Sequence, residues 1–188
     1  MKQYILPSIK LTIIFTILLC VIYPLFISFA AKLSAGKGSG EKVTLNGKVV
    51  GYRLLGQAFN QPQYFWGRPS AVNYNAAGSA GSNKGPTNPA YLQEVDNRID
   101  TLLKYHPGLK RNEIPADLVT ASGSGLDPNI SVEAAKIQAK RVAISRQVPL
   151  SKIIKLIDIH TEKPLFGLFG PSKINVLELN VALDQTRK

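Results

Sequence analysis

The feature that most constrains this chain is an uncharged apolar stretch near its start. Residues 11–31 hold 17 apolar side chains among 21 positions and contain no Asp, Glu, Lys or Arg. As a helix this stretch is about 30 Å long, which matches the hydrocarbon core of a bilayer. The sequence therefore predicts one transmembrane helix. Within it, Pro24 frees a backbone carbonyl that a neighbouring helix or a local Thr or Ser is expected to satisfy.

A cleaved signal peptide is the alternative for the same stretch. Lys2 and Lys10 give the chain a basic start, and Ser28 and Ala30 resemble a small-residue cleavage site. A typical signal core has about 7–15 apolar residues, so the greater length favours a retained anchor. Lysines flank the stretch on both sides in similar number, so charge does not decide which side of the membrane the rest of the chain occupies.

The rest of the chain has the composition of one folded domain. The sequence has 188 residues, 45% of them hydrophobic, which excludes an intrinsically disordered chain. We expect a terminal segment over residues 1–10, a Gly/Ser/Lys-rich linker over residues 32–41 and a single soluble domain over residues 42–188. The one cysteine, Cys20, excludes an internal disulfide and a cysteine-based zinc site.

The net charge of +11 is compatible with nucleic acid, anionic lipid or an acidic protein surface as partners. From residue 35 onward 20 basic residues face 12 acidic ones, which leaves +8 without a dominant run. Tyr64, Phe65 and Trp66 beside Arg68 are able to stack on bases, but an aromatic cluster that begins a domain more often belongs to the core. With a membrane anchor present, we expect lipid or protein contacts and no nucleic acid.

Two signals define the first part of the domain. The dipeptide Asn46-Gly47 predicts a tight hairpin between strands over residues 43–45 and 49–52. Residues 67–89 are rich in Gly, Ser, Asn and Pro and lack apolar periodicity, so they predict a long loop. A loop of this length is either functional or disordered, and the sequence leaves both readings open.

Helix caps organise the remainder of the domain. Three helices are expected, with N-caps at Asn88, Ser131 and Ser151. The first ends near Tyr105, and Arg141 and Arg146 lie near the end of the second, where the helix dipole favours positive charge. Residues 174–183 alternate apolar and polar side chains, which predicts a strand with one buried face. Strands at both ends with helices between them predict a single compact α+β domain.

The sequence shows no autonomous catalytic site. It contains no P-loop, and neither Ser122 nor Ser124 stands in a nucleophile elbow. Residues 122–125 form a Gly/Ser string before a helix, which either binds an anion or serves as an ordinary loop. His106 and His160 each lie near a predicted helix end, where solvated or capping roles are expected. We expect no catalytic residue, no metal site and no cofactor bound by the chain itself.

Five segments carry a more specific signal than any single Gly-rich string. They are GYRLLGQ (51–57), YFWGRPSA (64–71), GSAGSNKGPTNP (78–89), LVTASGSGLDP (118–128) and NVLELN (175–180). In this order they resemble the C subunit of the Kdp-type potassium-transporting ATPase. The resemblance runs from the apolar stretch to the C-terminus and covers nearly the whole chain.

The resemblance implies a single-pass, non-catalytic subunit of an inner-membrane potassium uptake pump, with residues 1–10 in the cytoplasm and the α+β domain outside it. The implied partners are a channel-like potassium-binding subunit, the P-type ATPase subunit, a small membrane subunit and membrane lipid. The family is described as a catalytic chaperone that raises the affinity of the ATPase subunit for ATP. Because ATP is not present outside the cytoplasm, we expect this effect to be transmitted through subunit contacts.

The same resemblance implies two groups of site residues. One group is similar, with a different spacing, to a transporter signature that contacts nucleotide, and consists of Ser122, Gly123, Ser124 and Gln138. The other group is implied in partner binding, with residues 67–89 docking on the channel-like subunit, and consists of Arg68, Pro69, Asn83, Gly85, Pro86, Asn88 and Asp127. The alternatives are a subunit that binds nucleotide directly on the cytoplasmic side and an unrelated membrane-anchored extracytoplasmic binding module.

Overall fold

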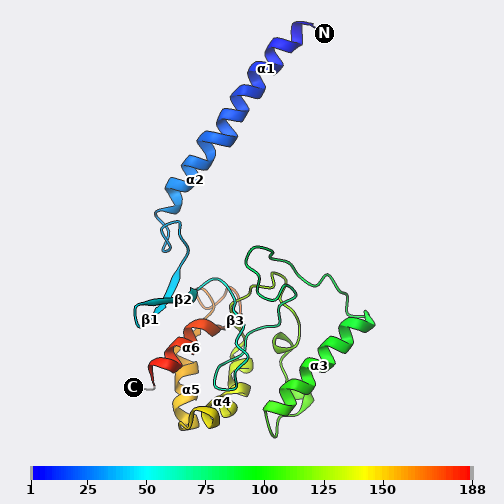
Figure 1. Cartoon of the computed structure of the whole chain (residues 1–188), viewed down its shortest axis with the longest axis vertical. Helices are drawn as coiled ribbons and strands as arrows, with labels where there is room; N and C mark the ends of the chain where they lie inside the picture. Colours follow the sequence, from blue (N-terminus) through cyan, green and yellow to red (C-terminus); the bar gives the residue numbers. More distant parts are fainter. Residues whose placement is uncertain (1, 187–188) are drawn as a thin grey trace. The chain divides into compact units, whose positions relative to one another are not determined.

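The computed structural model describes residues 2–186, and the chain divides into two compact units between Lys42 and Val43. The first unit is a long helix with the turns that follow it, and the second is an α+β body with small sheets (Figure 1). This confirms the expected N-terminal apolar helix and the α+β class.

The N-terminal unit is a continuous helix made of three elements. These are α1 (Lys2–Ile17), the π-helical turn η1 (Leu18–Ile22) and α2 (Tyr23–Ala31). The stretch Gln3–Ala31 has 29 residues and a mean hydropathy of 2.6, and its most apolar part buries no residue inside the protein. At roughly 1.5 Å per residue the helix is longer than a bilayer core of about 30 Å. It is therefore long and apolar enough to cross a membrane.

The π-helical turn explains how the helix continues through Pro24. Tyr23 N–H donates to Leu18 O, five residues back rather than four. Because proline contributes no N–H, an α-helix would leave a carbonyl unpaired at this point, and the wider turn changes the hydrogen-bond register there. The expectation that a neighbouring helix or a hydroxyl group pairs with the freed carbonyl stays a prediction.

A β-hairpin opens the α+β body, as the sequence predicted. Strand β1 (Lys42–Leu45) pairs with β2 (Lys48–Tyr52). Asn46 and Gly47 between them have φ angles of 51° and 77°, the positive values that a two-residue hairpin of this type requires. Residues 53–88, all of which the structure describes, contain no helix or strand.

A three-stranded antiparallel sheet lies among the helices of the body. Its order is β3 (Asn129–Ile130), β5 (Lys173–Asn175) and β4 (Thr161–Glu162). Ile130 pairs with Ile174 on one side, and Thr161 pairs with Ile174 on the other. The strands are short, so the sheet serves as a connection between helices more than as a separate layer.

Two of the three expected helix starts are confirmed. In α3 (Pro89–Tyr105) the N-cap Asn88 accepts from Tyr91 N–H, and in α4 (Val132–Arg146) the N-cap Ser131 accepts from Ala134 N–H. The third expectation is wrong, because α5 (Leu150–Ile159) begins before Ser151. Its N-cap is Pro149, whose ring fixes φ near −59° and so sets the start of the helix. Two short 3₁₀ helices, η2 (Arg111–Glu113) and η3 (Ala116–Leu118), join α3 to the segment before β3.

The strand predicted over residues 174–183 is wrong, because most of this segment is the helix α6 (Val176–Gln185). Only β5 at its start is extended. Asn175 caps α6 by accepting from Glu178 N–H at 3.1 Å. The buried positions are 176, 177, 179, 180 and 183, which recur with the spacing of one helix face. Leucines at every second position predict a strand when Asn180 is counted as a polar, outward residue. In the structure Asn180 is buried, and the same leucines then fit one face of a helix.

The hydrophobic core lies between α4, α5, α6 and the aromatic segment before the long loop. Helix α4 packs on α5, and α5 packs on α6. Small side chains on α4, including Ala134, Ala135 and Ala139, are fully buried and allow close approach. The largest fully buried apolar side chains are Phe65, Ile153, Ile157, Ile174, Leu179, Val142 and Leu183. The prediction that the aromatic cluster belongs to the core is therefore confirmed for Phe65.

Candidate functional site

Two buried side-chain amides hold the aromatic segment that leads into the long loop. Asn180 Oδ1 accepts from Phe65 N–H at 2.8 Å, and Asn180 Nδ2 donates to Phe65 O at 3.0 Å. Gln138 does the same for Trp66, with distances of 2.7 Å and 3.1 Å. We call this arrangement the amide clamp. Because buried peptide groups need hydrogen-bond partners, the clamp replaces the neighbouring strand that an extended segment would otherwise require.

Arg141 extends the amide clamp into the interior. Its Nη2 donates to Gln138 Oε1 at 2.7 Å, its Nε donates to His106 Nε2 at 3.0 Å, and its Nη1 donates to the carbonyls of Pro62 and Tyr64. The guanidinium also lies 4.2 Å from the centre of the Trp66 ring. Burial lowers the pKa of Arg141 to about 10, so the side chain stays charged at neutral pH. The sequence predicts that Arg141 lies near the helix end and interacts with the helix dipole. In the structure its side chain is instead buried in the interior of the body.

Arg146 holds the other side of the same segment. Its Nε donates to Gln63 O at 2.7 Å, and its Nη2 pairs with Asp184 at 2.8 Å. The guanidinium lies 4.9 Å from the centre of the Tyr64 ring. Tyr64 in turn donates its hydroxyl to Asp184 at 3.1 Å. Two arginines from α4 therefore fix the backbone and the rings of residues 62–66.

His106 is buried at the end of α3, so of the two expected roles, solvated or capping, the structure gives it the capping one. Its Nδ1 lies 2.7 Å from Leu102 O, so this nitrogen carries the proton, and Nε2 accepts from Arg141. Desolvation lowers the pKa of His106; the hydrogen bond to Leu102 acts in the opposite direction, and the charge of Arg141 lowers it further. Among the histidines, His160 also ends a helix, α5, and is half-buried.

We expect the stability of the body to fall as the pH falls below about 6.5, the ordinary pKa of histidine. The folded state binds a proton at His106 at a lower pH than the unfolded state does. Between these two pH values the unfolded state therefore binds more protons, and the free energy of unfolding decreases as the pH decreases. Urea unfolding measured between pH 7 and pH 5 checks this. The variant His106→Gln should lose this part of the slope, and His160→Gln, the control, should keep it; equal slopes in all three proteins would contradict the expectation.

The first part of the long loop is fixed on the Gly/Ser string at residues 122–125. Ser122 N–H donates to Pro69 O at 3.1 Å, and Ser70 Oγ donates to Gly125 O at 2.7 Å. Ser79 Oγ adds a bond to Ser124 O at 2.9 Å. These contacts show that the two Gly-rich segments, far apart in the sequence, form one unit.

Three of the residues implied in partner binding contribute to this junction. Arg68 and Asp127 form an ion pair at 3.0 Å, and Pro69 supplies the carbonyl that accepts from Ser122. Arg68 Nε is buried and is the one buried side-chain nitrogen without a hydrogen-bond partner in the part of the chain that the structure describes. The guanidinium of Arg68 therefore joins the long loop to the segment just before β3, and its Nε–H group is not used in this contact.

The second part of the long loop carries the remaining residues implied in partner binding. We call residues 83–86 the docking strip; Asn83, Gly85 and Pro86 are all exposed there. Asn83 has a φ of 52°, which asparagine tolerates. A Cβ added to Gly85 would meet no atom within 4 Å, so Gly85 is not required by packing inside the body. Asn88 is exposed too, but its side chain caps α3.

The four residues implied in nucleotide contact do not share one surface. Gly123 and Ser124 are exposed, whereas Ser122 and Gln138 are buried. Gln138 Nε2 donates to Trp66 O and Ala134 O, and Oε1 accepts two further bonds, so its amide has no free donor or acceptor. Nucleotide contact by this group stays a prediction.

The sequence did not identify Asn180 or Arg141 as structural centres, although a polar residue inside an apolar helix stripe is a signal for such a role.

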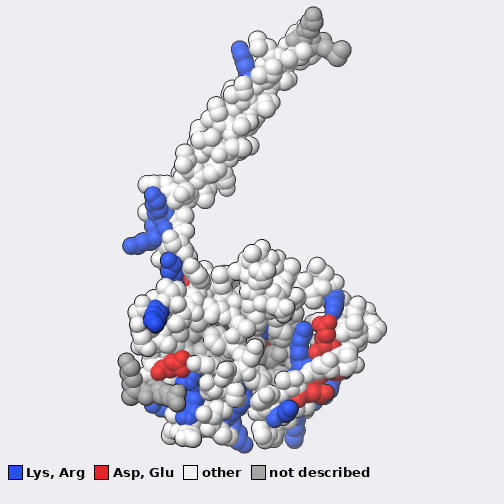
Figure 2. All heavy atoms as spheres, in the orientation of Figure 1, with Lys and Arg blue, Asp and Glu red and all other residues white. Residues whose placement is uncertain are grey.

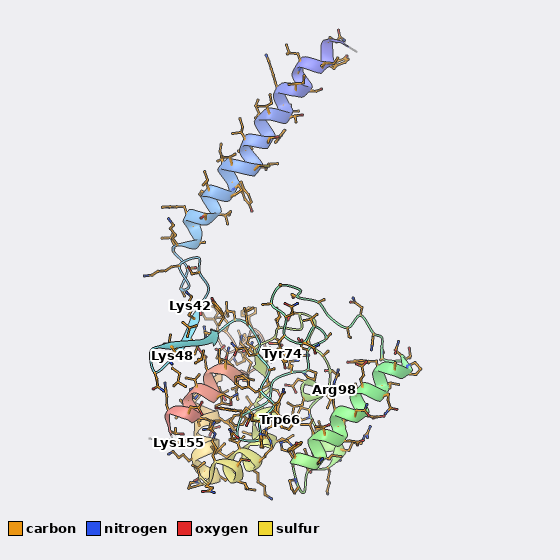
Figure 3. All side chains as sticks on the ribbon, viewed as in Figure 1. Lys42, Lys48, Trp66, Tyr74, Arg98 and Lys155 are labelled. Carbon is orange, nitrogen blue, oxygen red and sulfur yellow. The ribbon has the colours of Figure 1, made fainter. Side chains whose placement is uncertain are left out.

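Charged and concave surfaces lie around α3. Figure 2 shows basic and acidic side chains close together along this helix, where Lys84 pairs with Glu94 at 2.5 Å and Arg111 pairs with Asp96. A groove of about 590 Å³ runs between α3 and the first part of the long loop; Trp66, Tyr74 and Arg98, labelled in Figure 3, line it. Within residues 2–186, no cluster of three His, Cys, Asp or Glu residues offers a metal site.

Comparisons with known proteins agree with one another. The family model described as "KdpC: K+-transporting ATPase, c chain" matches residues 5–185. The potassium-transporting ATPase KdpC subunit of Flavobacterium johnsoniae is 57% identical over 178 residues, which are 95% of this chain and 96% of that protein. The subunit of the same name from Bacteroides fragilis is 50% identical over 185 residues, 97% of each chain. That of Caldanaerobacter subterraneus is 45% identical over 184 residues, 97% of this chain and 95% of that protein.

Proposed function

The chain belongs to the KdpC family of K+-transporting ATPase c chains, and we propose that it acts as the non-catalytic assembly subunit of the pump. In this proposal the apolar helix Gln3–Ala31 anchors the subunit in the cell inner membrane, and the α+β body lies outside the cytoplasm. The body docks on the channel-like potassium-binding subunit. The P-type ATPase subunit and a small membrane subunit complete the complex.

One observation carries the docking proposal: the docking strip is exposed on a segment whose neighbours are firmly held. Residues 62–66 are fixed by the amide clamp and two arginines, and residues 69–79 are fixed by the junction with residues 122–125. Within the docking strip Lys84 pairs with Glu94 of α3, whereas Asn83, Gly85 and Pro86 are exposed and Gly85 has open space around it. A rigid frame that presents a short exposed segment is suited to recognition of a partner, because little conformational entropy is lost on binding.

We propose further that the subunit raises the ATP affinity of the ATPase subunit as a catalytic chaperone, through contacts between subunits. If the assembled complex binds ATP more tightly than the ATPase subunit alone, linkage requires that ATP also strengthens assembly. No nucleotide contact by this chain is needed. The saturated amide of Gln138 supports transmission over direct binding, because this side chain could reach a nucleotide only by breaking bonds in the core.

The variant Gly85→Val tests the docking proposal. A Cβ at Gly85 meets no atom within 4 Å, so we expect folding to be unchanged, whereas a branched side chain at a close interface should prevent docking. We expect the amount of this subunit that co-purifies with a tagged ATPase subunit to fall about tenfold, equivalent to about 1.4 kcal/mol. Unchanged co-purification of the folded variant would contradict the proposal.

Gly123→Val is the matched control and also tests the alternative of direct nucleotide binding. A Cβ at Gly123 likewise meets no atom within 4 Å, but the residue belongs to the group implied in nucleotide contact. Under the docking proposal, pumps that contain Gly123→Val assemble normally and need the same ATP concentration for half-maximal hydrolysis. A higher ATP requirement with intact assembly would favour direct nucleotide contact instead.

A further inference from the structure

The connection between β4 and β5 exposes a compact group of large apolar side chains. We call residues 163–172 the Leu-Phe loop. Phe166 is 84% exposed and Leu168 is 81% exposed, and Leu165 and Phe169 beside them are 63% and 66% exposed. On α4 and α5, similarly exposed residues such as Ile144 and Ile159 stand singly. Four neighbouring side chains of this size are more than a soluble surface normally leaves in water.

The backbone of the Leu-Phe loop satisfies much of its own hydrogen bonding. Leu165 N–H donates to Phe169 O at 2.9 Å, and Phe169 N–H donates back to Leu165 O at 3.0 Å. Gly167 and Leu168 also donate within the loop, to Pro164 O and Leu165 O. Pro164 and Pro171 have no N–H to satisfy. A closed turn of this kind is able to leave water with little loss of hydrogen bonds, which is the condition for contact with lipid.

The conformation that exposes the two phenylalanines is held against a local preference. Phe166 has a φ of 54°, which is unfavourable for a bulky side chain, and Gly167 follows at 74°. Strained backbone of this kind persists where the surrounding structure requires it, and it is concentrated at functional segments.

The charges around the Leu-Phe loop are positive. Lys163 begins it and Lys173 follows it, and both are exposed. No acidic residue occurs between these two lysines. The carboxylate that directly precedes the loop in the sequence, Glu162, is paired with Arg53 at 2.8 Å and with Lys173 at 3.5 Å. Apolar side chains flanked by lysines are complementary to an anionic lipid surface. They are not complementary to an acidic protein surface, which would offer the apolar side chains no apolar contact.

We propose that the Leu-Phe loop binds the surface of an anionic bilayer, with its four apolar side chains among the upper acyl chains and its flanking lysines at the phosphate groups. The sequence keeps the body near such a surface, because residues 32–41 join it to the candidate membrane helix and span at most about 35 Å when fully extended. The subunit thus has a second membrane contact, independent of the helix and of the docking strip.

The test uses the full chain in nanodiscs of equal parts phosphatidylcholine and phosphatidylglycerol. Cys20→Ser removes the native thiol, and Leu168→Cys carries an environment-sensitive NBD dye. Phosphatidylcholine with a spin label near the headgroup quenches the dye only where the two meet. We expect strong quenching at position 168, and weaker quenching when phosphatidylcholine replaces phosphatidylglycerol, because the lysines then lose their anionic partners.

Ile144→Cys with the same dye is the matched control, since Ile144 is 66% exposed and lies in the same body, joined to the apolar helix by the same linker. We expect no quenching there, and we expect Phe166→Ser with Phe169→Ser to abolish the quenching at position 168 while Trp66 fluorescence stays unchanged. An unquenched dye at position 168, or equal quenching at both positions, would overturn the proposal. So would a dye at position 168 that leaves water only when the other pump subunits are added, because the loop would then bind protein. Failure of the Gly85→Val test affects none of these outcomes.

Discussion

Gln138→Leu is expected to lower the free energy of unfolding by about 4 kcal/mol. Leucine has a similar size but leaves three groups without partners: the half-buried N–H and carbonyl of Trp66 and one buried N–H of Arg141. Each unpaired buried group costs about 1–3 kcal/mol. Domains of this size have a total stability of about 5–15 kcal/mol, so the variant should lose between about a quarter and most of its stability.

Urea unfolding of the full chain in detergent micelles measures this effect, with the single tryptophan, Trp66, as the fluorescent reporter. Gln93→Leu is the matched control, because Gln93 lies on the exposed surface of α3 and its side chain donates to Asn97 in the next turn of the same helix. We expect a change of less than about 0.5 kcal/mol there. If Gln138→Leu unfolds at the same urea concentration as the native chain, the amide clamp does not have the stabilising role that its geometry indicates.

Gly125→Val should detach the long loop from the body. A Cβ at Gly125 would lie 2.5 Å from Val72 Cγ2 and 2.8 Å from Ala80 O, and the residue has a φ of 67°. Left-handed backbone alone costs a residue with a side chain about 1–2 kcal/mol, and the contact with a backbone oxygen adds to this. The bond from Ser70 to Gly125 O should break with it. We expect the core to remain folded and residues 70–80 to lose their protection.

Amide hydrogen exchange followed by mass spectrometry checks this expectation. Peptides from residues 70–80 should exchange about tenfold or more faster, which corresponds to a local loss of about 1.4 kcal/mol. Peptides from α4 should change little. Gly123→Val, two residues earlier and in open space, should leave both regions as they are. Equal protection of residues 70–80 in the two variants would show that the close approach at Gly125 does not hold the loop.

Local signals in the sequence predicted the elements that local chemistry determines. Asn46-Gly47 identified the hairpin, and Asn88 and Ser131 identified two helix starts, because each residue stabilises its own turn. The strand expected over residues 174–183 failed for the opposite reason. Leucines at every second position there also fit a helix face once Asn180 is counted as buried, and what buries Asn180 is the backbone of Phe65, far away in the sequence.

In the candidate site, too, the features set by local sequence could be predicted, and those set by distant contacts could not. The exposed character of Asn83 and Gly85 follows from a segment rich in Gly, Asn and Pro, which the sequence displays directly. The role of Gln138 does not, because two of its four hydrogen bonds connect α4 to Trp66, about seventy residues earlier, and no pattern within α4 specifies that partner. These contacts give Gln138 a packing role, and nucleotide contact by the group that contains it stays a prediction.

The π-helical turn before Pro24 has a consequence for the faces of the apolar helix Gln3–Ala31. In a regular α-helix, Thr16 and Ser28 would point about 120° apart, because twelve steps of about 100° separate them. A π-turn absorbs one residue and so removes about 100° of rotation, which leaves the two hydroxyl side chains about 20° apart. Small hydroxyl residues favour close contact between transmembrane helices. The proline and its wide turn thus align into one stripe two polar side chains that sequence spacing alone would place on different faces.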